Sequence, residues 1–489
     1  MKFKTFTILF LIGFFVSMAQ EDFTTQLYDS FEDYREASLN KRRIKHREIM
    51  PLIDSLASDT RFTIQKVGES IEGRDIKLIS IGEGDINIFL WTQMHGDEPT
   101  ATLASFDIFN FLMADEFQAE KDSILSKLKL HFIPMLNPDG AEVYKRRNAL
   151  DIDLNRDALR LQAPESRILK RIRDSLDADY GFNLHDQSRY YNAERNYIPA
   201  TISYLATAYI YEKEINETRA NAMKVIVYMN NIIQKYAPGQ VGRYSDDFEP
   251  RAFGDNISKW GTSLILIESG GFVGDREKHE IRKLNYVSIL SALYTIANGS
   301  FKDIPIEAYE EIPRNDRKLF DLKLEKVTHK LLGNDYLLDI GIYRQEIDLA
   351  GHDDFYYKSV IVDQGDLSTF YGYETFEGEG YTIIPPKLYD KPLKADIKPR
   401  EVLELLKRGY AYSRMLAAKS SDTDMHNELP YHILGANKPF PEFKVETGIN
   451  PTFFLEKEGV ITHAVINGFL VDLSKPLEGQ HFGNALIYR

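Results

Sequence analysis

The feature that most constrains the fold is a series of short apolar runs in the first 300 residues, separated by stretches with helical periodicity. Runs this short and this apolar are typical of strands buried on both faces of a sheet. Their alternation with helices predicts an α/β domain with a mixed, largely parallel central sheet flanked by helices. Four of the runs are INIFLWTQ, LKLHFIPML, GFNLH and TSLILIE.

The pattern changes after about residue 300. Helical runs become rare, and apolar residues recur with the period of two that is typical of strands with one buried face. We therefore expect one domain over residues 20–300 and a mainly β accessory region over residues 301–489, which could comprise two modules. Two longer segments have helical periodicity over much of their length: ISYLATAYIYEKEINETRANAMKVIVYMNNIIQKY in the first part and PREVLELLKRGYAYSRMLAAK in the second.

The N-terminus has the pattern of a secretory signal peptide. A short basic start, MKFK, precedes the apolar stretch FTILFLIGFFVSMA, and the small residues Ser17 and Ala19 suit cleavage after residue 19. The apolar stretch is shorter than the roughly 20 residues of a membrane-spanning helix, although an uncleaved anchor is the alternative. We expect residues 1–19 to be removed and the exported chain to have no membrane span.

The composition narrows the function classes. The chain has no cysteine, so any metal must be held by histidine and carboxylate, and an exported chain without disulfides favours a bacterial periplasm or cell exterior. The net charge of −14 and the lack of a long basic patch argue against a nucleic-acid partner. The sequence contains no GxGxxG, P-loop or GxSxG pattern, which argues against nucleotide cofactors and a serine hydrolase.

Polar groups follow the apolar runs where each predicted strand ends. His95 and Glu98 follow the first run, the turn NPDG follows the second, and His185 and Glu268 end the other two. Open α/β sheets bind ligands at the carboxyl edge of their strands, so these groups could converge on one cleft. Two histidines and a glutamate suit a catalytic zinc that keeps one position open for water. Taken alone, His95 and Glu98 could instead be a hydrogen-bonded histidine and a glutamate at a helix N-terminus.

The order of these motifs resembles that of the zinc metallocarboxypeptidase family, in its compact bacterial type. The chain has HGDE, then NPDG, an arginine nine residues before the asparagine of DLNR, a lone histidine and a strand that ends in glutamate. The stretch VGESIEGRDIKLISIG is similar to the entry strands of that family. The resemblance covers about residues 25–300. It implies a carboxypeptidase-like fold, one zinc ion, and a peptide substrate with a free C-terminal carboxylate.

The resemblance also implies a role for individual residues. The zinc ligands would be His95, Glu98 and His185, and Glu268 would be the general base and later the general acid. Further residues would bind the substrate or orient a ligand: Arg146 at the scissile carbonyl, Asn155 and Arg156 at the terminal carboxylate, Asp153 behind His95, and Tyr244 as a tyrosine on a mobile loop.

Several alternatives stay open. The chain could be a zinc amidase acting on peptidoglycan stem peptides or N-acyl amino acids, or an inactive peptide- or glycan-binding surface protein. The intact set of ligands and Glu268 favours an enzyme over a binding protein. Specificity is not decided by the sequence, because residues of both charges occur near the expected side-chain pocket, and the two residues after His185 could bind substrate or cap the strand. The residues near the expected pocket are Arg243, Arg251, Phe253 and Asp255. The two residues after His185 are Asp186 and Gln187.

Overall fold

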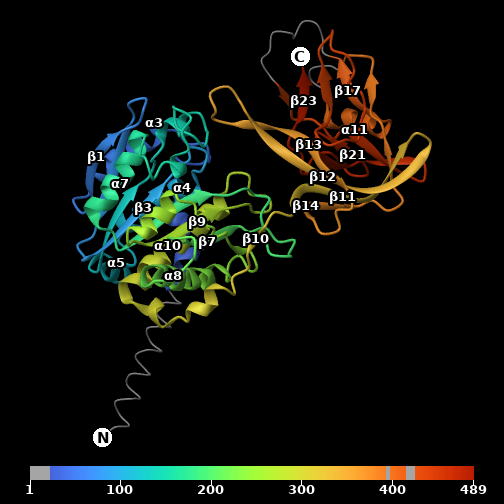
Figure 1. Cartoon of the computed structure of the whole chain (residues 1–489). Coiled ribbons are helices and arrows are strands. Elements are labelled where there is room, and N and C mark those ends of the chain that lie inside the picture. The colour runs from blue at the N-terminus through green and yellow to red at the C-terminus, as the bar shows by residue number, and fades with distance from the viewer. Residues whose placement is uncertain (1–22, 393–396, 415–424) are drawn as a thin grey trace. The chain divides into compact units, whose positions relative to one another are not determined.

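The chain forms two compact units, which divide between Arg317 and Lys318. The structure is a computed structural model that describes residues 23–392, 397–414 and 425–489. The predicted signal peptide, residues 1–19, lies outside this part. The first unit is drawn from blue to yellow in Figure 1 and the second from gold to red.

The first unit is built on an eight-stranded mixed sheet in the order β1-β2-β4-β3-β5-β9-β7-β8 (Figure 1). The four central strands, β4, β3, β5 and β9, are parallel, whereas β1, β2 and β7 pair antiparallel with a neighbour. This confirms the predicted mixed, largely parallel sheet. The strands are β1 (Thr63–Glu69), β2 (Asp75–Ile81), β3 (Ile86–Thr92), β4 (Leu128–Ile133), β5 (Tyr180–Asp186), β7 (Ile202–Ala206), β8 (Val241–Arg243) and β9 (Ser263–Ser269), with a short pair formed by β6 (Asn192–Ala193) and β10 (Asn315–Asp316).

Helices cover both faces of this sheet. The middle of strand β3 is apolar because both of its faces are buried: Ile88 and Leu90 enter one core, and Phe89 and Trp91 enter the other. The first core packs against α4 and α10, and the second packs against α7 and α9. The helices are α2 (Phe31–Tyr34), α3 (His46–Leu56), α4 (Thr100–Met113), α5 (Gln118–Leu125), α6 (Pro138–Glu142), α7 (Pro164–Leu176), α8 (Glu217–Ile233), α9 (Phe253–Lys259) and α10 (His279–Asn298), with 3-10 turns η1 (Leu154–Arg156), η2 (Ser300–Asp303) and η3 (Ile306–Tyr309).

The segment before the sheet is part of the first core. Phe23, Leu27 and Phe31 are at most 2% exposed and belong to the core that also contains α4 and α10. Arg282 of α10 donates to the carbonyl oxygens of Leu39 (2.6 Å) and Glu36 (3.2 Å). The N-terminal segment is therefore fastened to the sheet layer by apolar packing and by hydrogen bonds.

One helix prediction is wrong over part of its length. The segment that begins with ISYLA forms strand β7 (Ile202–Ala206) first, and its helix α8 begins only at Glu217. Every residue of β7 is buried, because β9 and β8 pair with its two edges. This position between two strands overrides the helical periodicity that the sequence shows.

The second unit is mainly β, as predicted. An eight-stranded sheet has the path β13-β12-β11-β15-β20-β21-β22, with β14 paired to β11, and a five-stranded sheet has the order β16-β17-β19-β23-β18. The strands are β11 (Leu319–Leu331), β12 (Asn334–Asp348), β13 (Phe355–Gly365), β14 (Tyr371–Glu377), β15 (Thr382–Ile384), β16 (Lys387–Tyr389), β17 (Tyr410–Arg414), β18 (His426–Asn427), β19 (His432–Leu434), β20 (Phe453–Lys457), β21 (Val460–Ile466), β22 (Phe469–Asp472) and β23 (Ala485–Tyr488).

The two faces of the eight-stranded sheet pack into separate cores. On β20, Phe453 and Leu455 enter one core, and Phe454 enters a second core with α11 (Pro399–Lys407). The predicted helix beginning with PREVLELLK ends at Lys407, and the following YAYSR forms β17 instead. Residues 415–424, the rest of that prediction, lie outside the described part. None of the helices in the described residues is long and apolar enough to span a bilayer.

Hairpin β11–β12 ends in an apolar tip. Leu331 pairs with Asn334, which leaves Leu332 and Gly333 as a two-residue loop. Both loop residues have positive φ, 50° and 81°, and the Leu332 side chain is 91% exposed. Positive φ at both central residues is the geometry of a type I′ turn, whose first position usually carries asparagine or aspartate.

Candidate metal centre

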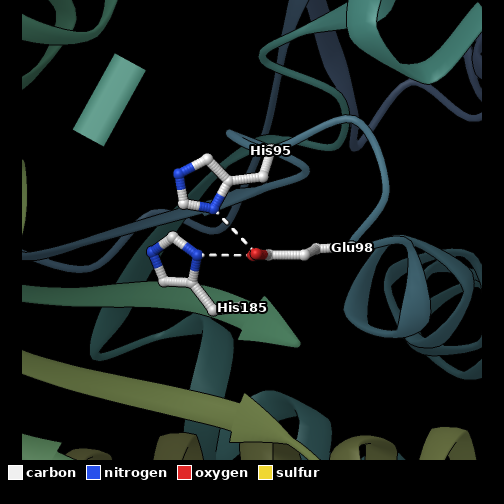
Figure 2. Close-up of side chains that lie close together, drawn as sticks. All are labelled: His95, Glu98 and His185. Carbon is white, nitrogen blue, oxygen red and sulfur yellow. Dashed lines mark hydrogen bonds and ion pairs between the residues drawn. The ribbon is translucent and has the colours of Figure 1, made fainter. Parts of the chain in front are cut away.

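Three side chains converge at the carboxyl edge of the central strands (Figure 2). His95 Nδ1 lies 2.8 Å from Glu98 Oε1, and His185 Nδ1 lies 2.7 Å from Glu98 Oε2. One donor atom from each residue lies within 4.8 Å of the other two, and all three residues are buried. Two imidazole nitrogens and a carboxylate oxygen are a donor set that suits zinc and leaves a position open for water. These residues could therefore hold one metal ion.

The local fold explains this convergence. His95 and Glu98 lie in the short connection between β3 and α4, and His185 is the penultimate residue of the neighbouring strand β5. Because β3 and β5 are parallel, both chains reach the same edge of the sheet. Glu98 precedes the first turn of α4, where the helix dipole favours a negative charge.

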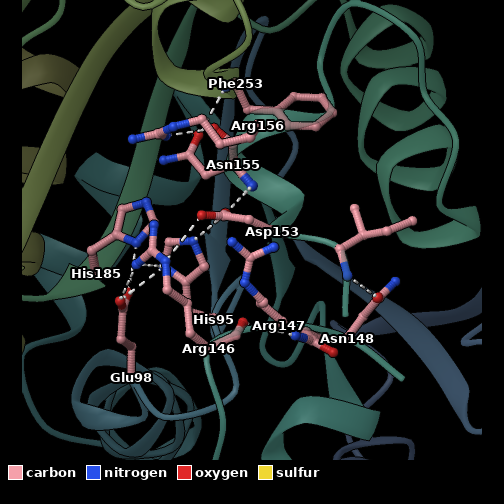
Figure 3. Close-up of polar contacts among 12 residues, drawn as sticks. His95, Glu98, Arg146, Arg147, Asn148, Asp153, Asn155, Arg156, His185 and Phe253 are labelled. Carbon is pink, nitrogen blue, oxygen red and sulfur yellow. Dashed lines mark hydrogen bonds and ion pairs between the residues drawn. The ribbon is translucent and has the colours of Figure 1, made fainter. Parts of the chain in front are cut away.

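Asp153 lies behind His95 and orients its ring (Figure 3). Asp153 Oδ1 lies 3.1 Å from His95 Nε2, and its Oδ2 accepts a hydrogen bond from Arg146 Nε at 3.0 Å. A carboxylate can only accept, so the proton of the neutral ring belongs on Nε2. This leaves the lone pair of Nδ1 directed at the cluster, which is the tautomer that a metal ligand needs.

Charges within the cluster shift the pKa of each member. Burial lowers the pKa of His95, but the carboxylates of Glu98 and Asp153 outweigh it and raise the pKa to about 9. Burial raises the pKa of Glu98, but His95 and His185 outweigh it and hold the pKa well below its usual range. The carboxylate of Glu98 thus carries its negative charge where a cation can compensate for it.

Glu268 lies on the strand next to His185. It pairs with His185 across the parallel ladder of β5 and β9, so the two side chains project from the same face of the sheet. Burial, followed by the negative charges of Glu98 and Asp186, raises the pKa of Glu268 well above its usual range, although His95 and Arg146 oppose the shift. A bound cation would offset this repulsion and lower the pKa again.

Arg146 faces the cluster, and Arg147 faces away from it (Figure 3). Arg146 Nη1 lies 3.0 Å from His95 Nδ1 and 3.2 Å from Glu98 Oε1. Arg147 Nη1 donates instead to the carbonyl oxygen of Asp151, at 2.8 Å. The geometry therefore distinguishes two adjacent arginines that the sequence separates only by family spacing.

Asn155 and Arg156 follow Asp153 in the turn η1. Asn155 Oδ1 accepts a hydrogen bond from the backbone N–H of Phe253 at 2.8 Å, which leaves the amide Nδ2 end to donate elsewhere. Arg156 Nη1 donates to the carbonyl oxygen of Asn155 at 2.7 Å, and its Nε lies 3.7 Å from Glu249 Oε2. The Arg156 side chain is 38% exposed, so part of its guanidinium faces solvent.

Tyr244 directly follows β8 and lies near the cluster. Its hydroxyl is 3.5 Å from the hydroxyl of Tyr191. Burial, the contact with Tyr191 and the charge of Glu268 raise the pKa of Tyr244, so its phenol stays protonated. The structure therefore brings Tyr244 into the electrostatic range of Glu268.

Other residues near the expected pocket are engaged by protein partners. Gln187 Nε2 donates to Ala200 O (2.9 Å) and Ser203 Oγ (2.8 Å), and Arg243 pairs with Glu310 at 2.7 Å. Asp186 Oδ2 accepts from both Thr100 and Lys278. The sequence did not single out Thr100 or Lys278, because each looks like an ordinary polar residue near a helix start.

Comparison with known proteins agrees with this geometry. Residues 49–220 match the family model described as zinc carboxypeptidase. The chain is thus similar to the zinc carboxypeptidase family over residues 49–220, all of which lie within the first unit. The match includes His95, Glu98, Arg146, Asp153 and His185, whereas Glu268 lies beyond it.

Individual carboxypeptidases are similar over short stretches. Carboxypeptidase SOL1 of Arabidopsis thaliana is 31% identical over 130 residues, which are 23% of this chain and 26% of that protein. Carboxypeptidase B of Astacus astacus is 35% identical over 98 residues, 19% of this chain and 32% of that protein. The chain thus spans about a quarter to a third of the length of these relatives.

Solved structures of carboxypeptidases are similar to about half of this chain. A metallo-carboxypeptidase from Burkholderia cenocepacia has a TM-score of 0.42 at 15% identity, over 52% of this chain and 69% of that one. Carboxypeptidase A from Helicoverpa armigera has a TM-score of 0.40 at 17% identity, over 56% and 80% of the two chains.

Proposed function

We propose that the chain is an exported, zinc-dependent metallocarboxypeptidase that removes C-terminal residues from peptides. The observation that carries the proposal is the convergence of two imidazoles and a carboxylate on one point, beside Glu268 and Arg146. His95, Glu98 and His185 would hold one zinc ion. Zinc bound there supplies a Lewis acid that polarises the scissile carbonyl and lowers the pKa of water towards about 7.

Glu268 is the proposed general base and acid. It would take a proton from the attacking water and deliver it to the leaving nitrogen, a contribution of about 10²–10⁴-fold in rate. Burial and the charge of Glu98 raise the pKa of Glu268 in the metal-free site, and a bound cation would lower it again, so that the carboxylate could accept the proton from water before passing it on.

Three further residues bind the substrate in this proposal. Arg146 would place its guanidinium at the carbonyl oxygen, where negative charge develops. Arg156 and Asn155 would bind the terminal carboxylate, with the arginine supplying paired hydrogen bonds and the asparagine its Nδ2 donor. A fixed distance between this carboxylate site and the metal restricts cleavage to the last peptide bond. Tyr244 is proposed to cover the bound substrate.

The test combines metal analysis with substrate release. Purified mature protein is analysed for zinc and incubated with a library of peptides that differ in their C-terminal residue, beside Glu268→Gln and Arg146→Met. We expect about one zinc per chain and release of single C-terminal residues, lost in both variants while zinc is retained. Arg147→Met is the matched control, because it removes the adjacent arginine that bonds only to Asp151 in this turn.

Two results would overturn the proposal. Zinc binding without release of C-terminal residues would exclude a carboxypeptidase and direct attention to cell-wall stem peptides or N-acyl amino acids. Failure to bind zinc after reconstitution would exclude metal-dependent hydrolysis and leave a binding protein.

A further inference from the structure

A lysine at the start of α10 (His279–Asn298) occupies a locally unfavourable position. Lys278 has a φ of 58°, in the left-handed region where residues other than glycine are strained. Its charge lies at the positive end of the helix dipole, and its side chain cannot accept a bond from the first amides of the helix, which Asp275 caps instead. Contacts elsewhere must therefore stabilise Lys278 in this conformation.

Those contacts lie behind the candidate metal centre. Lys278 Nζ donates to Asp186 Oδ2 at 2.9 Å and to the carbonyl oxygen of Ser269 at 3.0 Å. Thr100 Oγ1 donates to the same Asp186 oxygen at 2.6 Å. The side chains of Lys278 and Asp186 are only 12% and 7% exposed, so solvent screens this ion pair little.

Each partner adjoins a residue of the site. Asp186 follows His185 on β5, Ser269 follows Glu268 on β9, and Thr100 begins α4 two residues after Glu98. Because alternate residues of a strand face opposite ways, Asp186 projects away from His185, towards α4 and α10. One buried ion pair thus joins the three segments that carry the site, from the face opposite to His185.

We propose that Lys278 and Asp186 are positioning residues that set the relative places of Glu98, His185 and Glu268. The proposal rests on the function proposed above, because positioning matters only if these residues act together. Groups that hold metal ligands in place typically change metal affinity about 10–100-fold when removed. The pair acts through the backbone and the start of α4, without touching substrate.

The same two helices supply a matched control. Arg282, one turn further along α10, pairs with Asp107 of α4, with Nε to Oδ2 at 2.6 Å and both side chains fully buried. This second ion pair also joins α4 to α10, but its other bonds go to the N-terminal segment. Arg282→Met therefore removes a buried ion pair between the same helices and leaves the contacts of Lys278 with β5 and β9 in place.

The decisive measurement is the zinc dissociation constant, obtained by competition with a chelator. We expect Lys278→Met to weaken zinc binding about 10–100-fold, and Arg282→Met to lower the unfolding temperature while changing the constant by less than about twofold. The double variant Lys278→Met with Asp186→Asn leaves no unpaired buried charge and should still bind zinc about tenfold more weakly. An unchanged constant in Lys278→Met, an equal loss in Arg282→Met, or full affinity in the double variant would overturn the proposal.

A second readout needs no metal. Hydrogen exchange of residues 97–100, 184–187 and 267–270 in the metal-free protein should become at least about tenfold faster in Lys278→Met and stay unchanged in Arg282→Met. If the unaltered protein binds no zinc, the proposed function fails, yet this experiment still tests whether the ion pair holds the three segments. Unchanged exchange in Lys278→Met would refute the positioning role independently.

Discussion

Two buried histidines, one in each unit, differ in how completely their rings are bonded. In the second unit, His432 Nδ1 accepts from the backbone N–H of Leu486 at 2.9 Å, and its Nε2 lies 2.9 Å from Thr452 Oγ1. In the first unit, His185 Nδ1 faces Glu98, and its buried Nε2 has no hydrogen-bond partner. A ring bonded at both nitrogens to neutral protein groups stabilises a core, whereas a ring whose Nδ1 faces a carboxylate in a cluster of candidate ligands can bind a metal ion.

The surroundings of the two rings show the same difference. Around His432 the polar bonds continue from Thr452 to Asn450 and Asn467, and each step lies between 2.8 and 2.9 Å. Around His185, buried oxygen or nitrogen atoms without partners also occur on Asp97, Asn183 and Asp186. The polar groups around His432 are thus bonded to one another, whereas some polar atoms in the segments next to His95 and His185 have no protein partner.

The strongest way to break this comparison is to remove each histidine in turn. His185→Ala deletes a proposed ligand and should weaken zinc binding by about 100-fold or more, since a ligand contributes more than the groups behind it. His432→Ala should leave the zinc content unchanged, even if the second unit unfolds. Chelator competition measures the zinc affinity of His185→Ala, and elemental analysis measures the zinc content of His432→Ala. Equal loss of zinc in the two variants would refute the distinction.

A smaller loss of zinc affinity is expected from a change to Asp153, which contacts His95 in the first unit. Asp153→Asn replaces the acceptor that orients His95 and should weaken zinc binding about 10–100-fold with little change in fold. Asp157→Asn is the control, because Asp157 lies in the same loop and accepts only from the backbone of Gln162 and Ala163. Zinc affinity equal to that of the unaltered protein in Asp153→Asn would mean that His95 needs no such support.

The second unit should show a pH dependence that belongs to its own histidine. Burial lowers the pKa of His432 to about 3, although the bond from Leu486 opposes the shift, while an unfolded histidine has a pKa of about 6.5. Below about pH 6.5 only the unfolded chain binds the proton, so stability falls as pH falls. Between pH 7 and pH 5 the loss is about 2 kcal/mol.

Urea unfolding at the two pH values measures this loss. Both tryptophans, Trp91 and Trp260, lie in the first unit, so tryptophan fluorescence follows that unit and the near-ultraviolet dichroism of tyrosine adds the second. His432→Gln should be less stable at pH 7 but should lose about 2 kcal/mol less on acidification. An identical pH slope in the variant would show that His432 does not titrate in this range.

The smallest expected effect is a change in stability at two residues with positive φ, Leu332 and Lys278. Leu332, at the exposed hairpin tip, serves no partner within the described residues, so Leu332→Asn should stabilise the second unit by about 0.5–1 kcal/mol through better turn geometry. Lys278→Asn should instead destabilise the first unit, because the lysine contacts are lost. Thermal unfolding measures both changes in stability. Stabilisation by Lys278→Asn would show that the lysine contacts do not outweigh the cost of its positive φ.

Much of the first fold could be predicted because its central strands are apolar on both faces. β3 has no charged residue, and the only charged residue of β9 is its penultimate one, Glu268, so a short buried strand is the element that these sequences favour. Strand β7 was missed because ISYLA leads into a segment with helical periodicity, and only the pairing with β8 and β9 reveals it as a strand.

The candidate site was predictable to the extent that its residues lie at the ends of strands. His95, Glu98 and His185 follow apolar runs, which is a local signal. The ion pair of Lys278 and Asp186 joins residues 92 positions apart, and Lys278 lies in the polar stretch GDREKHE, which looks like an exposed turn. A contact of this kind follows from packing and has no period or motif.

The N-terminal segment packs into the first core although it lies outside the residues that match the family. The match to the family begins at residue 49 and ends at residue 220, before β8, β9 and α10. A protein cut at those limits would lose Phe23, Leu27 and Phe31 from the core and would leave Asp107 without Arg282. The segment that matches the family therefore shares its core with residues on both sides of it. We do not expect residues 49–220 to fold by themselves after excision or transfer to another protein.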